Sequence, residues 1–193
     1  GYYVLPIYIL EKEKWQQPSH SYRQWQFCKE SLIDLKEDLS LMGQPLIIRI
    51  GDVIEIFEEI KNTFKIKGIY SHQETGDFLS YKRDQKVREW SKENDILWTE
   101  YLQFGVFRGQ LKRDQWAKNY KKHFEKDIIK VSKSLKKLPF KDENLPSDEF
   151  FKFEKDNYHG RYRGGRKEAL KRLNYFLNNE MHSYSKNISS PDK

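Results

Sequence analysis

The sequence holds few side chains of the types that carry out covalent or metal chemistry. Its five histidines are scattered over 193 residues, and none forms the HExxH pair that places two zinc ligands on one helix face. The single cysteine, Cys28, excludes an internal disulfide and a thiolate zinc cage. Its position on the apolar stripe of a predicted helix suits a buried, unreactive thiol. We therefore expect no metal site.

Clustered basic residues make anion binding the better-supported chemistry. The net charge is +7, and residues 108–141 hold twelve lysines and arginines against three acidic residues, a local charge of +9. Further along, the Gly164-Gly165 pair is surrounded by Arg161, Arg163 and Arg166. Both groups suit contact with the phosphates of a polyanion such as DNA. A solvated, lysine-rich helix is the alternative for the first group.

The elements that must position these residues follow from the hydrophobic pattern. Continuous apolar runs predict four buried parallel strands, which begin near Val4, Leu46, Lys67 and Ile96. Between the first two, apolar residues recur every three or four positions from Trp25 to Met42, which predicts a helix ended by Gly43. Asp52 is a predicted N-cap of the next helix. The alternation is typical of a doubly wound parallel α/β sheet with helices on both faces.

The pattern divides the chain into three parts. We expect an α/β domain over residues 1–125, an interdomain linker over 126–160 and a helical part over 161–193. The linker is rich in charge and contains Pro139 and Pro146, so we expect it to be the least regular part and mostly exposed. One side of the final helix carries Leu170, Leu173, Leu177 and Tyr184.

No apolar run approaches the roughly 20 residues of a membrane span, and no signal peptide opens the chain. With one cysteine, these features favour a reducing, soluble setting. We expect a monomer in the cytoplasm, the nucleoid or the nucleus, with no membrane partner.

Three stretches resemble the photolyase/cryptochrome family. The first comprises Val4–Leu10, Glu30–Leu35, Gly43–Leu46 and Gly51-Asp52. The second comprises Tyr81–Asp84, Val87, Trp90, Gln103–Arg108 and Trp116. The third comprises Gly164-Gly165, Leu170, Leu173, Phe176-Leu177, Tyr184 and Ser189–Pro191. Their order along the chain makes the resemblance specific, whereas no GxxxxGK[ST] or GxGxxG motif is present.

The resemblance implies a Rossmann-like domain that lacks its first strand, followed by a linker and the first helix of a truncated FAD domain. Because the missing strand lies centrally in the family's sheet, we expect a gap or a rearrangement between its neighbours. The implied function is that of a fragment, itself inactive, of a deoxyribodipyrimidine photolyase, a carbon–carbon lyase that uses light and FAD to repair dimers in damaged DNA. A cryptochrome photoreceptor and a non-catalytic α/β nucleotide-binding module are the alternatives.

The resemblance also implies roles for particular residues. Tyr184, eight residues after Phe176, matches the position at which the family places a tyrosine against FAD, although a helix-end packing role is the alternative. His72 and Glu74 follow the third predicted strand, where an antenna chromophore (folate, deazaflavin or flavin) would lie, or where a solvated polar turn would suffice. The arginines at 161, 163 and 166 would lie near DNA. We expect Trp90, Trp98 and Trp116 to pack in the core.

Overall fold

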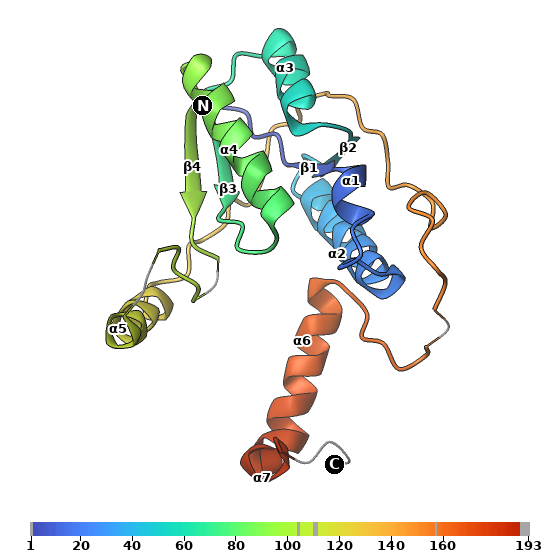
Figure 1. Cartoon of the computed structure of the whole chain (residues 1–193), viewed down its shortest axis with the longest axis vertical. Coiled ribbons are helices and arrows are strands. Elements are labelled where there is room, and N and C mark those ends of the chain that lie inside the picture. The colour runs from blue at the N-terminus through green and yellow to red at the C-terminus, as the bar shows by residue number, and fades with distance from the viewer. Residues whose placement is uncertain (1, 104, 110–111, 157, 190–193) are drawn as a thin grey trace. The chain divides into compact units, whose positions relative to one another are not determined.

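The computed structural model describes residues 2–103, 105–109, 112–156 and 158–189 (Figure 1). Its contacts divide the chain into two compact units. Unit 1 contains residues 1–8, 15–49 and 133–193, and unit 2 contains residues 9–14 and 50–132. Unit 1 is therefore built from both ends of the chain, and each unit is described by itself below.

The four strands are β1 (Ile7–Leu10), β2 (Ile47–Ile50), β3 (Gly68–His72) and β4 (Leu97–Tyr101). The N–H of Ile47 donates to Pro6 and that of Gly51 to Leu10, so β1 and β2 run in the same direction. β3 and β4 are parallel, with Gly68 opposite Leu97. These pairs confirm the α/β class and the parallel strands.

The predicted single sheet of four strands is wrong in its continuity. The strands form two separate two-stranded sheets, β1-β2 and β3-β4. Apolar runs indicate which segments form strands but not which strands pair, so the sequence pattern did not reveal this division.

Unit 1 is organised around α2 (Tyr22–Leu41), which the spacing of apolar residues predicted. Its N-terminus has a capping box, in which Ser21 and Gln24 satisfy each other's backbone N–H groups. The helix ends beside Gly43, whose φ of 104° lies in the region that favours glycine. A short helix, α1 (Lys12–Trp15), precedes α2.

The core of unit 1 has an aliphatic part and an aromatic part. Leu32, Leu46 and Ile48 are buried together, and Cys28 packs against them as a half-buried thiol outside any disulfide. Nearby, the Trp25 ring lies 5.3 Å from Trp15 and 4.8 Å from Phe151, measured between ring centroids. Trp25 is fully buried, so this cluster fixes α2 to the segment around Phe151.

Residues 126–160 contain no helix or strand among those that the structure describes, which confirms the predicted irregularity. The segment is nevertheless tied to α2 and β2 by charged contacts. Lys29 donates to Asp148 at 2.6 Å, Lys36 pairs with Asp142, and Arg49 donates to Glu143 at 3.1 Å. We call residues 133–160 the strap, because their described part contains no helix or strand and pairs with α2 and β2.

After the strap, unit 1 ends in a long irregular helix. It comprises α6 (Arg166–Tyr175), a π turn η1 (Phe176–Glu180), a 3-10 turn η2 (Met181–Ser183) and α7 (Tyr184–Asn187).

Unit 2 packs α3 (Val53–Thr63) against α4 (Phe78–Glu93), beside β3 and β4. Asp52 caps α3 by accepting from the N–H groups of Ile54 and Glu55, as predicted. Trp90 is buried and lies 5.3 Å from the Phe57 ring. The expectation of a core position is wrong for Trp116, which is 41% exposed because its helix α5 (Arg113–Phe124) buries no residue.

No helix in the described part of the chain is both long and apolar enough to cross a bilayer.

Trp25 offers a direct test of the core. Trp25→Ala removes a fully buried ring and should lower the free energy of unfolding by about 3–5 kcal/mol. Urea unfolding of this chain, followed by circular dichroism, measures the change. Ile128→Ala, at a side chain that is 94% exposed, is the control and should stay within about 0.5 kcal/mol of wild type. Equal midpoints for the two variants would contradict the proposed core.

Candidate functional site

The start of α6 is docked on α2 by side chains from a single face of α2. Glu30 accepts two bonds from the Arg161 guanidinium, at 2.6 and 2.9 Å, and a third from the Gly164 N–H at 2.8 Å. Ser31 accepts from the Gly165 N–H at 3.0 Å. One turn on, Asp34 accepts from the Lys167 N–H at 3.2 Å. Because Gly165, the N-cap, has no side chain to cap α6, α2 satisfies the free N–H groups in its place.

Two glycines permit this close approach. A Cβ atom at Gly164 would overlap the Phe27 carbonyl oxygen, and one at Gly165 would meet the Asp34 side chain at 2.9 Å. Gly165 also has a φ of 104°. The contacts perturb ionisation, since the Arg161 hydrogen bonds outweigh the opposing effect of burial and lower the pKa of Glu30. The Lys167 N–H likewise lowers the pKa of Asp34.

Tyr184 lies beyond this junction, at the first residue of α7. Its ring meets Phe176 edge-on, with centroids 5.5 Å apart. The side chain is 51% exposed, and its hydroxyl makes no hydrogen bond within the described part of the chain. The π turn between the two aromatic residues is of a kind that is frequent at functional sites.

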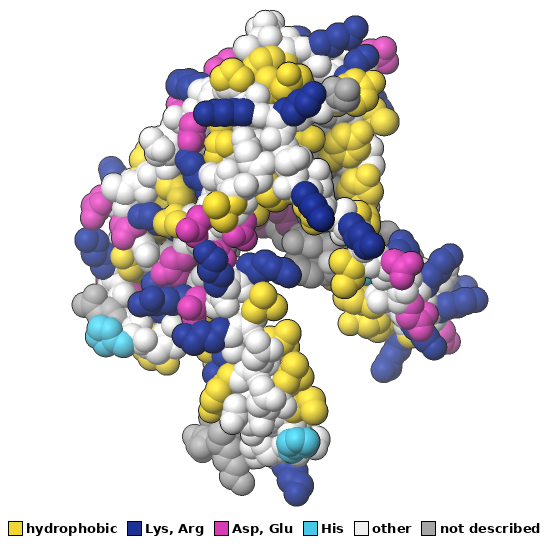
Figure 2. Space-filling view, turned by 180° about the vertical axis from the view of Figure 1, so that it is seen from behind, with side chains coloured by type: hydrophobic (Ala, Val, Ile, Leu, Met, Phe, Trp, Pro, Cys, Tyr) yellow, Lys and Arg dark blue, Asp and Glu magenta, His cyan; other side chains and the backbone are white. Residues whose placement is uncertain are grey.

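The helix that carries Tyr184 has an uncovered apolar side. Leu170, Leu173 and Leu177 are each between 43% and 49% exposed, and the hydrophobic side chains along this helix are visible in the lower part of Figure 2. Such a row of half-exposed leucines is typical of a surface that packs against another body.

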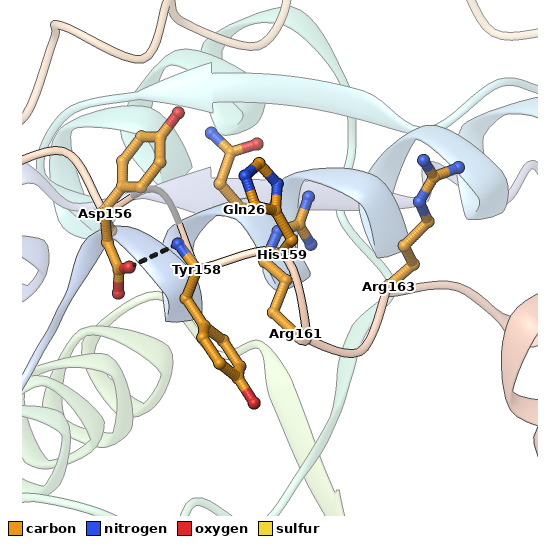
Figure 3. Close-up of a pocket in the computed structure, with 7 residues that line it drawn as sticks. Gln26, Asp156, Tyr158, His159, Arg161 and Arg163 are labelled. Carbon is orange, nitrogen blue, oxygen red and sulfur yellow. Dashed lines mark hydrogen bonds between the residues drawn. The ribbon is translucent and has the colours of Figure 1, made fainter.

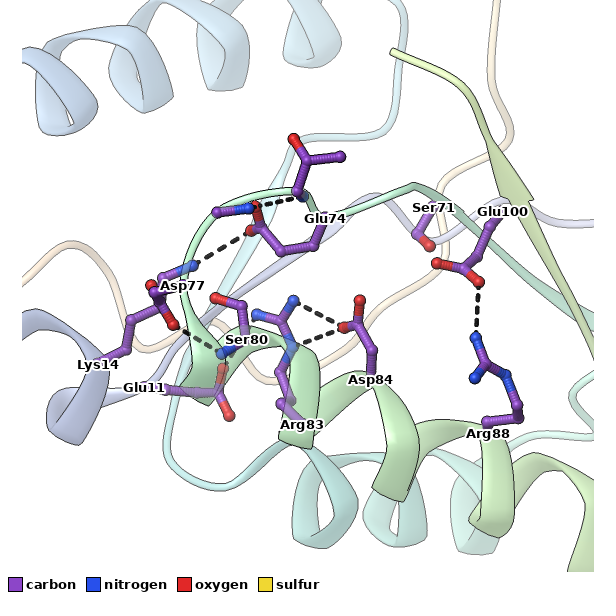
Figure 4. A network of polar contacts seen from close by, with 12 residues as sticks. Glu11, Lys14, Ser71, Glu74, Asp77, Ser80, Arg83, Asp84, Arg88 and Glu100 are labelled. Atoms are coloured by element: carbon purple, nitrogen blue, oxygen red, sulfur yellow. Dashed lines mark hydrogen bonds and ion pairs between the residues drawn. The ribbon is translucent and has the colours of Figure 1, made fainter. Parts of the chain in front are cut away.

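The loop after β3 places His72 and Glu74 differently. His72 is exposed at the last position of β3. Both carboxylate oxygens of Glu74 are engaged, one by Lys14 at 3.3 Å and the other by the N–H groups of Thr75 and Gly76 (Figure 4). Burial alone would raise the pKa of Glu74, but Lys14 and the Gly76 N–H lower it overall. Glu74 thus shapes its own loop and holds it to Lys14.

A partly buried ionic network supports that loop, and the sequence did not predict its contacts. Asp84, only 6% exposed, accepts from Arg83 at 2.9 Å and from Arg108 at 3.2 Å. Arg108 also donates to the Glu74 carbonyl and to Glu100. Arg83 reaches Glu11 at 3.2 Å, and burial raises the pKa of that carboxyl despite the guanidinium (Figure 4). Arg83 and Arg108, which belong to the stretches that carry the resemblance, are therefore linked through the Asp84 carboxylate.

The three arginines near Gly164-Gly165 differ in their surroundings. Arg161 is held by Glu30, whereas Arg163 and Arg166 are exposed and their guanidiniums make no hydrogen bond or ion pair with any residue that the structure describes. Arg161 and Arg163 line a pocket of about 310 Å³, shown in Figure 3. Its other lining residues are Tyr22, Gln26, Asp156, Tyr158 and His159. Of the three arginines, Arg163 is therefore the one that lines the pocket and whose guanidinium has no partner among the described residues.

The parallel strand pairs with intervening helices define a Rossmann-like α/β protein. The chain belongs to the DNA photolyase family, which it matches over residues 1–127. Members of this family generally bind FAD and damaged DNA. A comparison with curated proteins gives no match.

Solved structures share the fold at low identity. A bacterial class III photolyase from Agrobacterium tumefaciens is 16% identical, with a TM-score of 0.71 over 96% of this chain and 41% of its own. A Synechocystis sp. PCC6803 cryptochrome is 18% identical, with a TM-score of 0.73 over 96% and 43%. An archaeal photolyase from Sulfolobus tokodaii, described with two FAD molecules, is 20% identical, with a TM-score of 0.59 over 90% and 40%. The chain thus spans about two fifths of the length of these proteins.

The docked helix start should depend on Glu30. Glu30→Gln keeps the shape but weakens the charge-assisted bonds to Arg161 and Gly164, so amide hydrogen exchange in the first turn of α6 should become roughly 5- to 30-fold faster. A carboxyl with a lowered pKa stabilises the fold at high pH and loses that effect as the pH falls through the folded value. The wild-type contact should therefore weaken below the usual carboxyl pKa of 4.5, and the variant should lack this component.

Glu59→Gln, on α3 in the other unit, is the matched control and should leave α6 exchange unchanged. Equal exchange in wild type and Glu30→Gln would show that α6 is held by other contacts.

Proposed function

We propose that the chain forms the α/β part, and the first helix of the flavin-binding part, of a deoxyribodipyrimidine photolyase. The observation that carries this proposal is the family match over residues 1–127, together with photolyase-like folds that align with 96% of the chain. In the complete protein, bound FAD supplies light absorption and electron donation, and the polypeptide supplies binding and orientation. On this proposal the isolated chain is inactive.

The helix that carries Tyr184 is the proposed flavin contact. The ring is half-exposed and its hydroxyl is unpartnered within the described residues, so both are open to a ligand. An aromatic face packs on a ring system, and a phenol donates to a phosphate oxygen. The docking of α6 by Glu30 and Asp34 fixes the direction of this helix within unit 1, so these carboxylates position Tyr184 from a distance.

Two further contacts belong to the proposal. His72 and Glu74 lie at the C-terminal end of β3, the edge where α/β sheets bind ligands, and are the proposed antenna-chromophore residues. Since the Glu74 carboxylate is already engaged, the exposed His72 is the more available of the two. For damaged DNA, Arg163 and Arg166 are more available than Arg161, which Glu30 occupies.

A cryptochrome photoreceptor is the second candidate, favoured by the similar TM-score of 0.73 to the Synechocystis cryptochrome. A cryptochrome binds flavin but signals through a partner. Dimer repair by the complete protein under blue light, absent in the dark, separates the two functions.

The isolated chain should not repair DNA. With FAD, a reductant and blue light, an oligonucleotide containing a thymine dimer should remain intact, because on this proposal the chain lacks most of the flavin-binding part. Chromatography of the irradiated oligonucleotide measures this, with an active photolyase as the positive control. Light-dependent splitting by the 193-residue chain would refute the proposal that the isolated chain is inactive.

In the complete protein, Tyr184→Ala should weaken FAD binding. Loss of the ring contact and one hydrogen bond to a phosphate costs about 2–4 kcal/mol, which is roughly 30- to 1,000-fold in dissociation constant. Fluorescence titration with FAD measures the change, and circular dichroism verifies folding. Tyr184→Phe keeps the ring and should lose only the part of the FAD-binding free energy that the hydroxyl contributes. Equal affinities in all three proteins would reduce Tyr184 to a packing residue.

A further inference from the structure

We propose that the pocket between α2 and the segment 158–163 binds a phosphate group, with Arg163 and His159 as its ligands. His159, Arg161 and Arg163 stand at alternate positions of this segment, while Gln26 faces them from α2 (Figure 3). The segment therefore contributes three nitrogen-bearing side chains to the lining of one pocket.

One positively charged side chain of the pocket has no ion-pair partner among the described residues. Asp156, the acidic residue that lines it, pairs with Arg23, and its other oxygen accepts from the Tyr158 N–H. Farther back, Asp148 pairs with Lys29. Glu30 carries one negative charge against two guanidiniums, since it binds Arg161 and only attracts Arg163. Of the cations that line the pocket, Arg163 is thus the one without an ion pair among the described residues, and it also lines a second hollow with Glu37 and Glu168.

The unsatisfied groups at this site are donors. Arg163 has five N–H groups in a planar fork that matches two oxygens of a phosphate. His159 offers at least one ring N–H in either tautomer and has no hydrogen-bond partner in the described part of the chain. A surplus of donors beside a positive charge selects an anion with several acceptor oxygens. A metal cation would be repelled, and an apolar ligand would leave these groups unsatisfied.

The size of the pocket indicates how much of a ligand it accommodates. At about 310 Å³, it lies at the lower end of small-molecule sites. This volume suits one phosphate with its attached sugar, and the phosphate has two possible sources: the backbone of DNA, or a free mononucleotide. The DNA source rests on the proposed function, whereas the mononucleotide source does not.

The test uses this chain and two probes, AMP and a single-stranded ten-residue oligodeoxynucleotide, with binding measured by calorimetry and by NMR shifts. Arg163→Gln and His159→Gln should each weaken binding about tenfold. Lys65→Gln is the control, because it removes an exposed positive charge that does not line the pocket, and it should stay within twofold. Circular dichroism verifies that each variant is folded.

Arg163→Lys keeps the charge but not the fork, so an intermediate loss would support bidentate recognition. Equal losses in Arg163→Gln and Lys65→Gln would overturn the site in favour of diffuse charge, as would the absence of binding at millimolar AMP and oligonucleotide. Competition identifies the source: AMP that displaces the oligonucleotide indicates one shared phosphate site, and an oligonucleotide effect that AMP cannot compete indicates a backbone contact.

The outcomes for the site and for the proposed photolyase function remain distinguishable. If the complete protein repairs no dimers while the chain binds AMP through Arg163, only the proposed function fails. If the complete Arg163→Gln protein repairs dimers normally and the chain shows no phosphate binding, only the site fails.

Discussion

The arrangement of unit 1 depends on one contact, in which the start of α6 meets a face of α2. A helix begins with N–H groups that have no partner inside the helix, and each must find an acceptor. Here the acceptors come from another helix about 130 residues earlier, with Glu30 binding Gly164 and Asp34 binding Lys167. Because these bonds are directional, they fix the angle as well as the position of α6. The orientation of everything beyond Gly165 follows from that angle.

Charged residues dominate the strap because their ion pairs determine its path toward this contact. The segment reaches α6 only after passing α2 and β2, and its acids pair with Lys29, Lys36 and Arg49 along the way. Individual exposed ion pairs contribute little to stability, but several along one path specify where an irregular segment runs. Phe151, buried against Trp25, supplies the apolar anchor that the ion pairs lack. The strap is therefore held by a few specific points and needs no regular structure.

Local signals in the sequence predicted the local structure well. The periodicity from Trp25 to Met42 and the cap at Asp52 each require information from only a few neighbouring residues, and both agree with the structure. Contacts across long separations were not predictable in the same way. Glu30 and Arg161 are 131 residues apart, and nothing in the spacing of either segment specifies the other. The division into two strand pairs escaped prediction for the same reason, because apolar runs indicate strands without indicating which strands pair.

The discontinuous make-up of unit 1 has a consequence for how the chain forms during synthesis. The Trp25 and Phe151 rings that meet in its core are 126 positions apart in sequence, so at about 5–20 residues per second the ribosome takes roughly 6 to 25 seconds to supply the second after the first. Unit 2, which ends at residue 132, is complete on the nascent chain before that. During this interval Trp25 has Trp15 but not Phe151 as an aromatic partner, and nascent-chain chaperones have a defined window in which to shield the incomplete core.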